Sequence, residues 1–261
     1  MLTGHSAGYD AASQRLANFR RVLEAAAQTD YYRTHLEAAR LVETDALNRL
    51  RSVEEALRDL PVLEREALIA DPGRFRSRLI RPAHKRPDAG LRRLWNRKRE
   101  SIAGPISALR CLAVEVMTGR APVPVGARRL MVQTSLIETS LGDRDRDLLW
   151  QAFELPVFEE LRGLDGELLA SECEAHSGQH PEPDSVFLEP APAPSGLLLT
   201  SLAATGYPTL RLRVHLSSVP TPFGCDCGSR AELLEWFQAL PARKPVRMDR
   251  GTALRSMAGA G

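Results

Sequence analysis

Three of the four cysteines lie in two short motifs whose residue types are those of a metal site. Cys173 precedes two histidines, His176 and His180, and Cys225 and Cys227 flank a single residue in a turn bounded by glycines. Zinc takes four Cys or His ligands in a tetrahedron, usually two from each of two loops. The spacing therefore predicts a zinc site of three cysteines and one histidine, with His180 preferred over His176.

The same motifs leave other interpretations open. The Cys-x-Cys spacing is tighter than the usual Cys-x₂-Cys, and free thiols beside a buried Cys173 would give the same pattern. A catalytic zinc would keep an open coordination position and a nearby acid, such as Glu172 or Glu174. Four available protein ligands favour a closed, structural zinc site instead. Cys111 lies in an apolar stretch and is predicted to belong to the core.

A second candidate site is a strongly basic segment at 74–99. It carries eleven Lys or Arg residues against one acid, whereas the whole chain has a net charge of only +2. Such a run is typical of a solvated helix face, but it also fits an acidic protein surface, such as a carrier protein or a partner enzyme. Nucleic acid is a less favoured partner, because Trp95 is the one aromatic ring among the later cations. The residues predicted to bind a partner are Arg92, Arg93, Arg97, Lys98 and Arg99.

Hydrophobic periodicity predicts an α+β protein with a helical N-terminal half. Apolar residues recur at helical spacing in residues 13–46, and Ser52 to Glu55 has the Ser-x-x-Glu pattern of a capping box. Further helices are expected at 63–70, 102–117, 144–153 and 231–240, and strands at 130–132, 156–161, 185–188, 196–201 and 210–216. The second half is therefore expected to be a mixed α/β region rich in antiparallel strands.

The elements and the composition together predict the domain organisation. We expect a flexible N-terminus at 1–12, a helical region at 13–120, an α+β zinc-containing region at 128–248 and a flexible tail at 249–261. The sequence has no apolar run of about eighteen residues and no signal-peptide pattern, so we expect a cytoplasmic protein that does not contact a membrane.

Several motifs in residues 148–228 resemble, in order, those of the phenylacetate-CoA ligase branch of the adenylate-forming (AMP-binding) enzymes. The matching elements are Glu172-Cys173-Glu174, Gly178-Gln179-His180, the strand from Gly196 to Leu202, Pro208-Thr209-Leu210-Arg211-Leu212-Arg213, and Cys225-Asp226-Cys227-Gly228. The resemblance implies a fold like part of the large domain of those enzymes. It also implies a metal ion at the Cys and His positions.

Departures from the family pattern imply that the ATP chemistry is lost. Adenylation needs a Ser/Thr/Gly-rich loop to hold phosphates, and no such loop occurs between the N-terminal helices and residue 128. The family's Tyr-Gly-x-Thr-Glu motif corresponds to residues 162–166, Arg-Gly-Leu-Asp-Gly, and the acid that holds the ribose falls on Leu216. The lysine-bearing lid is expected to be absent, with Lys244 a poor substitute. The resemblance therefore implies a truncated and degenerate relative.

The sequence supports three functions of different classes. The favoured one is a non-catalytic, zinc-stabilised homologue that acts as a binding or scaffolding partner. The first alternative is an enzyme, either a CoA- or acyl-group transferase or half of a split ligase that another chain completes. The second alternative is a nucleic-acid-binding module that acts through residues 74–99.

Overall fold

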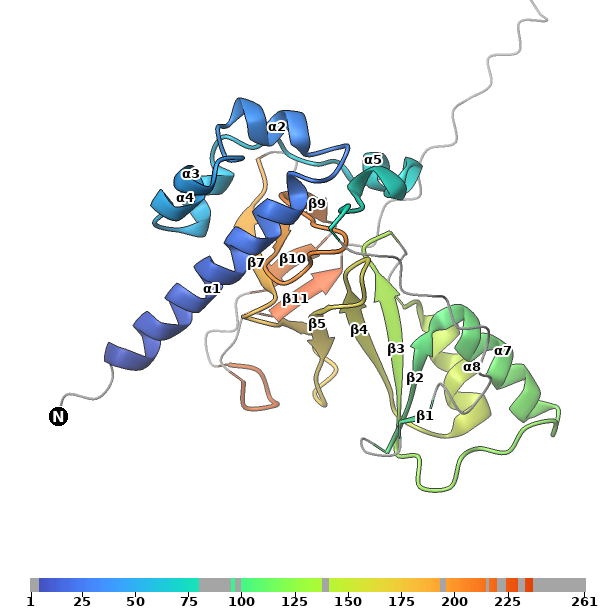
Figure 1. The fold of residues 1–261 in the computed structure, drawn as a ribbon. Coiled ribbons are helices and arrows are strands. Elements are labelled where there is room, and N and C mark those ends of the chain that lie inside the picture. The colour runs from blue at the N-terminus through green and yellow to red at the C-terminus, as the bar shows by residue number, and fades with distance from the viewer. Residues whose placement is uncertain are drawn as a thin grey trace, which may run out of the picture.

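The computed structural model describes residues 5–79, 95–96, 100–137, 141–192, 196–214, 216–219, 224–229 and 233–236. Within these segments the protein has an eight-stranded mixed sheet, a three-stranded antiparallel sheet and two groups of helices (Figure 1). The predicted tail at 249–261 lies outside the described residues. So do the predicted partner-binding residues, which are Arg92, Arg93, Arg97, Lys98 and Arg99. None of the described helices has both the length and the apolar character needed to cross a bilayer. The cytoplasmic location stays a prediction.

The first group of helices forms the N-terminal part of the chain. Its members are α1 (His5–Ala26), α2 (Arg33–Ala38), α3 (Thr44–Arg49), α4 (Val53–Leu57), α5 (Arg65–Ala70) and the short 3₁₀ helix η1 (Pro72–Phe75). Helix α1 begins at His5, earlier than the predicted start at residue 13. The capping box of α4 is confirmed, because Ser52 Oγ accepts the N–H of Glu55 at 3.2 Å. The Glu55 carboxylate reaches one residue beyond the N-cap and accepts the N–H of Arg51 at 2.8 Å.

The second group, α7 (Ile106–Met117) and α8 (Asp143–Phe153), packs on one end of the large sheet (Figure 1). That end contains β1 (Trp95–Asn96), β2 (Ser101–Pro105), β3 (Arg129–Ser135) and β4 (Val157–Arg162). Strands β2, β3 and β4 are parallel to one another, and α7 and α8 are the crossovers between them. In β3, Leu130 and Val132 are fully buried, whereas the alternate residues are only partly buried.

Two predictions in this part of the chain were wrong. The expected helix at 102–117 begins only at Ile106, because Gly104 and Pro105 belong to strand β2. Periodicity alone does not separate a short buried strand from a buried helix. Cys111 is exposed on α7 rather than in the core, since Leu109, Leu112 and Ala113 form the buried face of that helix.

The large sheet continues beyond β4 with antiparallel strands, as predicted for the second half. These are β5 (Leu168–Glu172), β6 (Gln179–Pro181), β11 (Leu233–Trp236) and β10 (Leu216–Val219), in that spatial order. The prediction of a helix at 231–240 was wrong for Leu233–Trp236. These residues form strand β11, which pairs with β10 on one side and with β6 on the other. Pairing with two neighbouring strands outweighs the local preference of so short a segment.

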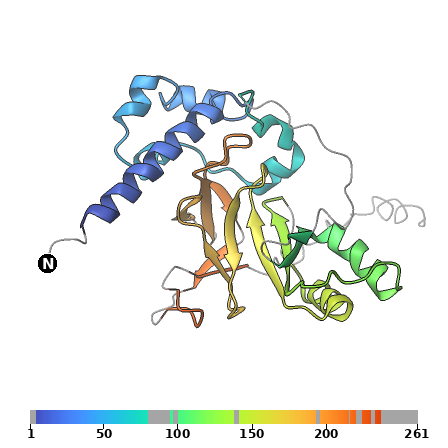
Figure 2. The same ribbon diagram turned by 60° about the horizontal axis from the view of Figure 1, so that its bottom comes forward.

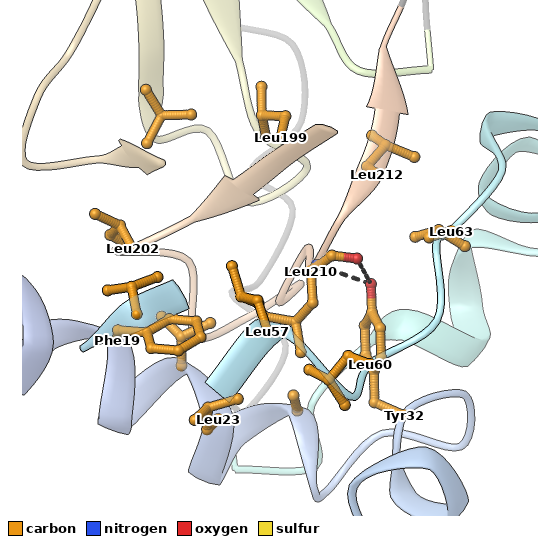
Figure 3. Close-up of a cluster of buried hydrophobic side chains, with 14 of the residues drawn as sticks. Phe19, Leu23, Tyr32, Leu57, Leu60, Leu63, Leu199, Leu202, Leu210 and Leu212 are labelled. Atoms are coloured by element: carbon orange, nitrogen blue, oxygen red, sulfur yellow. Dashed lines mark hydrogen bonds between the residues drawn. The ribbon is translucent and has the colours of Figure 1, made fainter. Parts of the chain in front are cut away.

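The small sheet joins the N-terminal helices in one core, at the side of the molecule away from α7 and α8 (Figure 2). Its strands are β7 (Val186–Pro190), β8 (Leu197–Ser201) and β9 (Leu212–Val214). Figure 3 shows Phe19 and Leu23 of α1 in the same cluster as Leu199, Leu202 and Leu212. The helical region and part of the α+β region are therefore not packed separately from each other.

Tyr32 makes a specific contact between the N-terminal helices and the segment before β9 (Figure 3). Its hydroxyl accepts the N–H of Leu210 at 2.9 Å and donates to the carbonyl oxygen of the same residue at 3.3 Å. The Tyr32 side chain is buried, so no water can replace these bonds easily.

Substituting Tyr32→Phe is expected to lower the free energy of unfolding by about 1 to 3 kcal/mol, because the N–H and carbonyl groups of Leu210 would both stay buried without partners. Urea denaturation followed by far-UV circular dichroism measures the change. Tyr31→Phe is the matched control, since no hydrogen bond from its hydroxyl is found among the described residues. Equal stability of Tyr32→Phe and wild type would contradict the prediction.

Candidate metal centre

Three neighbouring strands bring the predicted ligands to one place. Cys173 directly follows β5, His180 lies within β6, and the turn with Cys225 and Cys227 precedes β11. Strands β5 and β6 are paired, with Ser171 opposite His180, and β6 is paired with β11. The loops at these strand ends therefore meet at the same edge of the sheet.

The donor atoms are spaced as a tetrahedral metal site requires. Cys173 Sγ lies 3.6 Å from Cys225 Sγ, and Cys227 Sγ lies 3.4 Å from His180 Nε2. All four donor atoms lie within 4.8 Å of one another. Bonds of about 2.3 Å to sulfur and about 2.0 Å to nitrogen place tetrahedral ligands about 3.8 Å (S to S) and about 3.5 Å (S to N) apart. The cluster can hold a metal ion with little movement of these side chains.

The structure separates the two candidate histidines. His180 belongs to the cluster, whereas the Nδ1 of His176 lies 2.8 Å from Oε1 of Glu172. Glu172 was considered as an acid beside a catalytic metal, but its other carboxylate oxygen accepts a hydrogen bond from Arg146 at 3.0 Å. The four-residue set Cys173, His180, Cys225 and Cys227 is thus the group that the fold assembles.

The pKa values of Cys173 and Cys225 are shifted in opposite directions. Burial raises the pKa of Cys173 to about 11, while a backbone N–H from Cys227 is the largest contribution that lowers the pKa of Cys225 to about 7. Metal ions bind the thiolate, so a bound divalent cation would favour loss of the Cys173 proton. Metal affinity is therefore expected to depend on the protonation of these sulfurs.

Glycines allow the two metal loops to approach closely. Gly178 has a φ of +139°, and a Cβ at this position would lie 2.7 Å from the carbonyl oxygen of Leu234. Gly228 has a φ of +86°, in the left-handed region, and closes the turn that carries the two cysteines. A larger residue at Gly178 would push β11 away from the loop that follows Cys173.

The loop between β4 and β5 contains residues 162–166, which the sequence comparison set against a nucleotide motif, and its polar side chains bind within the protein. Arg162 donates to Glu160 at 2.5 Å and 3.0 Å and to the carbonyl oxygen of Gly166 at 2.7 Å. Asp165 accepts the N–H groups of Gly206 and Tyr207 at 2.8 Å and 3.4 Å. Asp165 therefore holds the loop against the segment after β8, and Arg162 ties the loop to β4.

A partly buried glutamate, whose Oε2 is fully covered, lies next to this loop and was not predicted. Glu167 packs against Gly163, where a Cβ would lie only 2.0 Å from its Oε1. Ser201 Oγ donates to the same oxygen at 3.2 Å. Burial is the main reason why the pKa of Glu167 is raised to about 9. The pairing of Gly163 with a carboxylate four residues later was the only sequence signal, and it is too common to be specific.

Comparison with known proteins identifies the fold. No family model and no curated protein matches the chain. The structure is similar to 2-hydroxyisobutyryl-CoA ligase in complex with 2-HIB-AMP and CoA, with a TM-score of 0.51 and 16% identity over 85% of this chain and 68% of the ligase. For the postadenylation state with R3-HIB-AMP, the TM-score is 0.52, again at 16% identity, over 89% and 67% of the two chains. The protein therefore has the mixed α/β fold of adenylate-forming CoA ligases, of which it resembles part of the large domain.

Proposed function

We propose that this protein is a non-catalytic relative of the adenylate-forming ligases, of the phenylacetate-CoA ligase type, that acts as a binding or scaffolding partner. A structural zinc ion stabilises its C-terminal half. The observation that carries the proposal is the cluster of Cys173, His180, Cys225 and Cys227 on a ligase fold whose nucleotide motif is occupied by internal contacts.

The donor set favours zinc over other metals and a structural over a catalytic role. Thiolate and imidazole ligands suit zinc, whereas magnesium, calcium and manganese prefer oxygen ligands. Four protein ligands complete a tetrahedron, so no coordination position is left for a water molecule or a substrate. The metal then contributes to folding and not to a chemical step.

The loss of ATP chemistry is proposed from positions inside the chain. An adenylating enzyme stabilises the charge of the reacting phosphates by several independent groups. Here the phosphate loop has no counterpart before residue 128, and Leu216 stands where the ribose acid is expected. At the nucleotide motif, Arg162 and Asp165 are engaged with the protein itself. The degenerate character of the ligase core is part of this proposal.

An acidic protein surface is the proposed partner. The support is the basic segment at 74–99, which carries eleven cations against one acid. A carrier protein or a partner enzyme would present such a surface, and long-range attraction would speed their encounter. The cations proposed to make the contact are Arg92, Arg93, Arg97, Lys98 and Arg99.

The isolated protein is expected neither to bind ATP with micromolar affinity nor to release pyrophosphate from it. Loss of one oxyanion-type donor costs an enzyme about 100- to 1000-fold in rate, and several such groups are replaced here. Calorimetry with ATP, AMP and CoA at about physiological salt tests binding. A pyrophosphate assay over a panel of aryl and acyl acids tests turnover.

The salt dependence provides the control for this test. The basic segment is expected to hold ATP loosely through its phosphates, without preference for adenine and only at low ionic strength. Weak binding of ATP and inorganic triphosphate alike, lost as salt is added, therefore agrees with the proposal. Adenine-specific micromolar binding, or pyrophosphate release that depends on an added acid, would contradict it and make the protein a ligase.

A further inference from the structure

The side chain of Glu172, the residue before Cys173, joins three elements of the fold. It is only 6% exposed, and its Oε2 accepts the guanidinium of Arg146 on α8 at 3.0 Å and the N–H of Glu159 on β4 at 2.8 Å. Its Oε1 lies 2.8 Å from Nδ1 of His176. Charge-assisted hydrogen bonds of this length are the strong ones, so the carboxylate is held in one position.

His176 extends this arrangement to the turn that begins at Cys173. Its imidazole stacks on Phe158, with ring centroids 4.7 Å apart and an interplanar angle of 18°. The backbone N–H of His176 donates to the carbonyl oxygen of Cys173 at 3.0 Å. The backbone φ of His176 is +50°, a conformation that non-glycine residues seldom adopt without support from their surroundings. Glu172 therefore supports both ends of the turn. It is the residue directly before Cys173, and its carboxylate contacts the imidazole of His176.

Cys173 depends on this turn for the direction of its sulfur. The other cysteines of the cluster lie on the turn before β11, so Cys173 is the one thiol ligand that the β5 side supplies. Groups outside the ligand set that orient ligands commonly set metal affinity, and their loss typically costs about 10- to 100-fold. A loose turn at 173–176 would leave the sulfur of Cys173 without a defined position.

We propose that Glu172 is a positioning residue of the metal centre, which fixes the Cys173 turn through His176 and ties it to α8 through Arg146. This inference rests on the metal binding proposed above. Replacing Glu172 by glutamine removes the negative charge that pairs with Arg146 and puts an amide group where a carboxylate oxygen faces His176, so the ion pair that ties the turn to α8 is lost.

Glu160 is a matched control for this substitution. Its carboxylate is equally buried, at 5% exposed, and it pairs with an arginine, Arg162, at 2.5 Å. It lies on the neighbouring strand β4 but makes no described contact with the turn at 173–176. Glu160→Gln therefore removes a comparable buried ion pair without changing the support of the metal loop.

Four full-length proteins decide the question: wild type, Glu172→Gln, His176→Phe and Glu160→Gln. Each is stripped of metal and titrated with Zn²⁺ against a chromophoric chelator, and the spectrum of each Co²⁺ form is recorded. We expect Glu172→Gln to bind Zn²⁺ about 10- to 100-fold more weakly than wild type. His176→Phe is expected to lose part of that affinity, and Glu160→Gln is expected to keep all of it. A change in the Co²⁺ absorption bands of Glu172→Gln alone would support an altered ligand geometry.

The outcomes separate this inference from the proposed function. Absence of metal binding by wild type would overturn the zinc proposal itself. Tight binding by wild type and by Glu172→Gln alike would overturn only the positioning role. An equal loss in Glu160→Gln would also overturn it, because general destabilisation would then explain the effect. Where Glu172→Gln does not fold, His176→Phe decides, since its half-exposed side chain tolerates replacement.

Discussion

Protein purified without added zinc is expected to contain close to one equivalent of zinc, and Cys225→Ser is expected to lose it. The zinc would join residues 52 positions apart, Cys173 and Cys225. Closing a loop of that length stabilises the folded state by about 4 kcal/mol in the chain-entropy model for cross-links. Chelation should therefore lower the thermal midpoint by about 10 °C for a chain of this size. Metal analysis and calorimetry measure the two effects.

The loss of stability should be greatest near the metal loops. Hydrogen exchange is expected to rise first in β5, β6 and β11, since the cluster ties these strands together, and last in the buried face of α1. Cys111→Ser is the control, because this exposed cysteine is not part of the cluster. A thermal midpoint that chelator leaves unchanged would mean that the cluster is empty or has no structural role.

Glu167 is expected to make the protein less stable as the pH rises. Its pKa of about 9 in the folded protein compares with an ordinary value of 4.5, so the folded state binds its proton more tightly than the unfolded state does. Stabilisation is therefore complete below about pH 4.5 and is lost progressively as the pH approaches 9. Between pH 5 and pH 8 the free energy of unfolding should fall by roughly 2 to 4 kcal/mol from this group.

The variant Glu167→Gln tests this pH dependence. Glutamine resembles the protonated acid but cannot ionise, so the variant should be more stable than wild type at pH 8 and should lack this part of the pH slope. Urea denaturation at half-unit pH steps measures the slope. Glu66→Gln, at an exposed position on α5, should behave as wild type does. A slope that Glu167→Gln retains in full would assign the pH dependence to other groups.

The candidate site was predictable because its signal is local. Cys225 and Cys227 share one turn, and Cys173 and His180 lie in the hairpin of β5 and β6, so residue type and spacing indicated the ligand set, with His180 preferred over His176. The support of the site was not predictable in the same way. Glu172 contacts Arg146 of α8 and a backbone group of β4, and no periodic pattern relates these positions.

The fold shows the same division between local and non-local signals. The capping box at Ser52 and the helix α8 follow from short patterns, and both are confirmed. Strand β11 was predicted as a helix, because its identity depends on pairing with β6 and β10 and not on its own four residues. The boundary between β2 and α7, at Pro105 and Ile106, was not predicted. A short apolar strand that leads directly into an apolar helix shows no separate hydrophobic periodicity.

The contact between Tyr32 and Leu210 has a consequence for how the protein is made. It joins residues 178 positions apart, and Leu63 binds Arg211 of the same segment through its backbone. A ribosome releases α1 long before it releases β9, so the helix emerges without the strands that cover it. Contacts this distant form slowly, because a long loop must close before they contribute to stability. Until then Phe19 and Leu23 are exposed to solvent or bound by a chaperone. The nascent chain is most prone to aggregation during that interval.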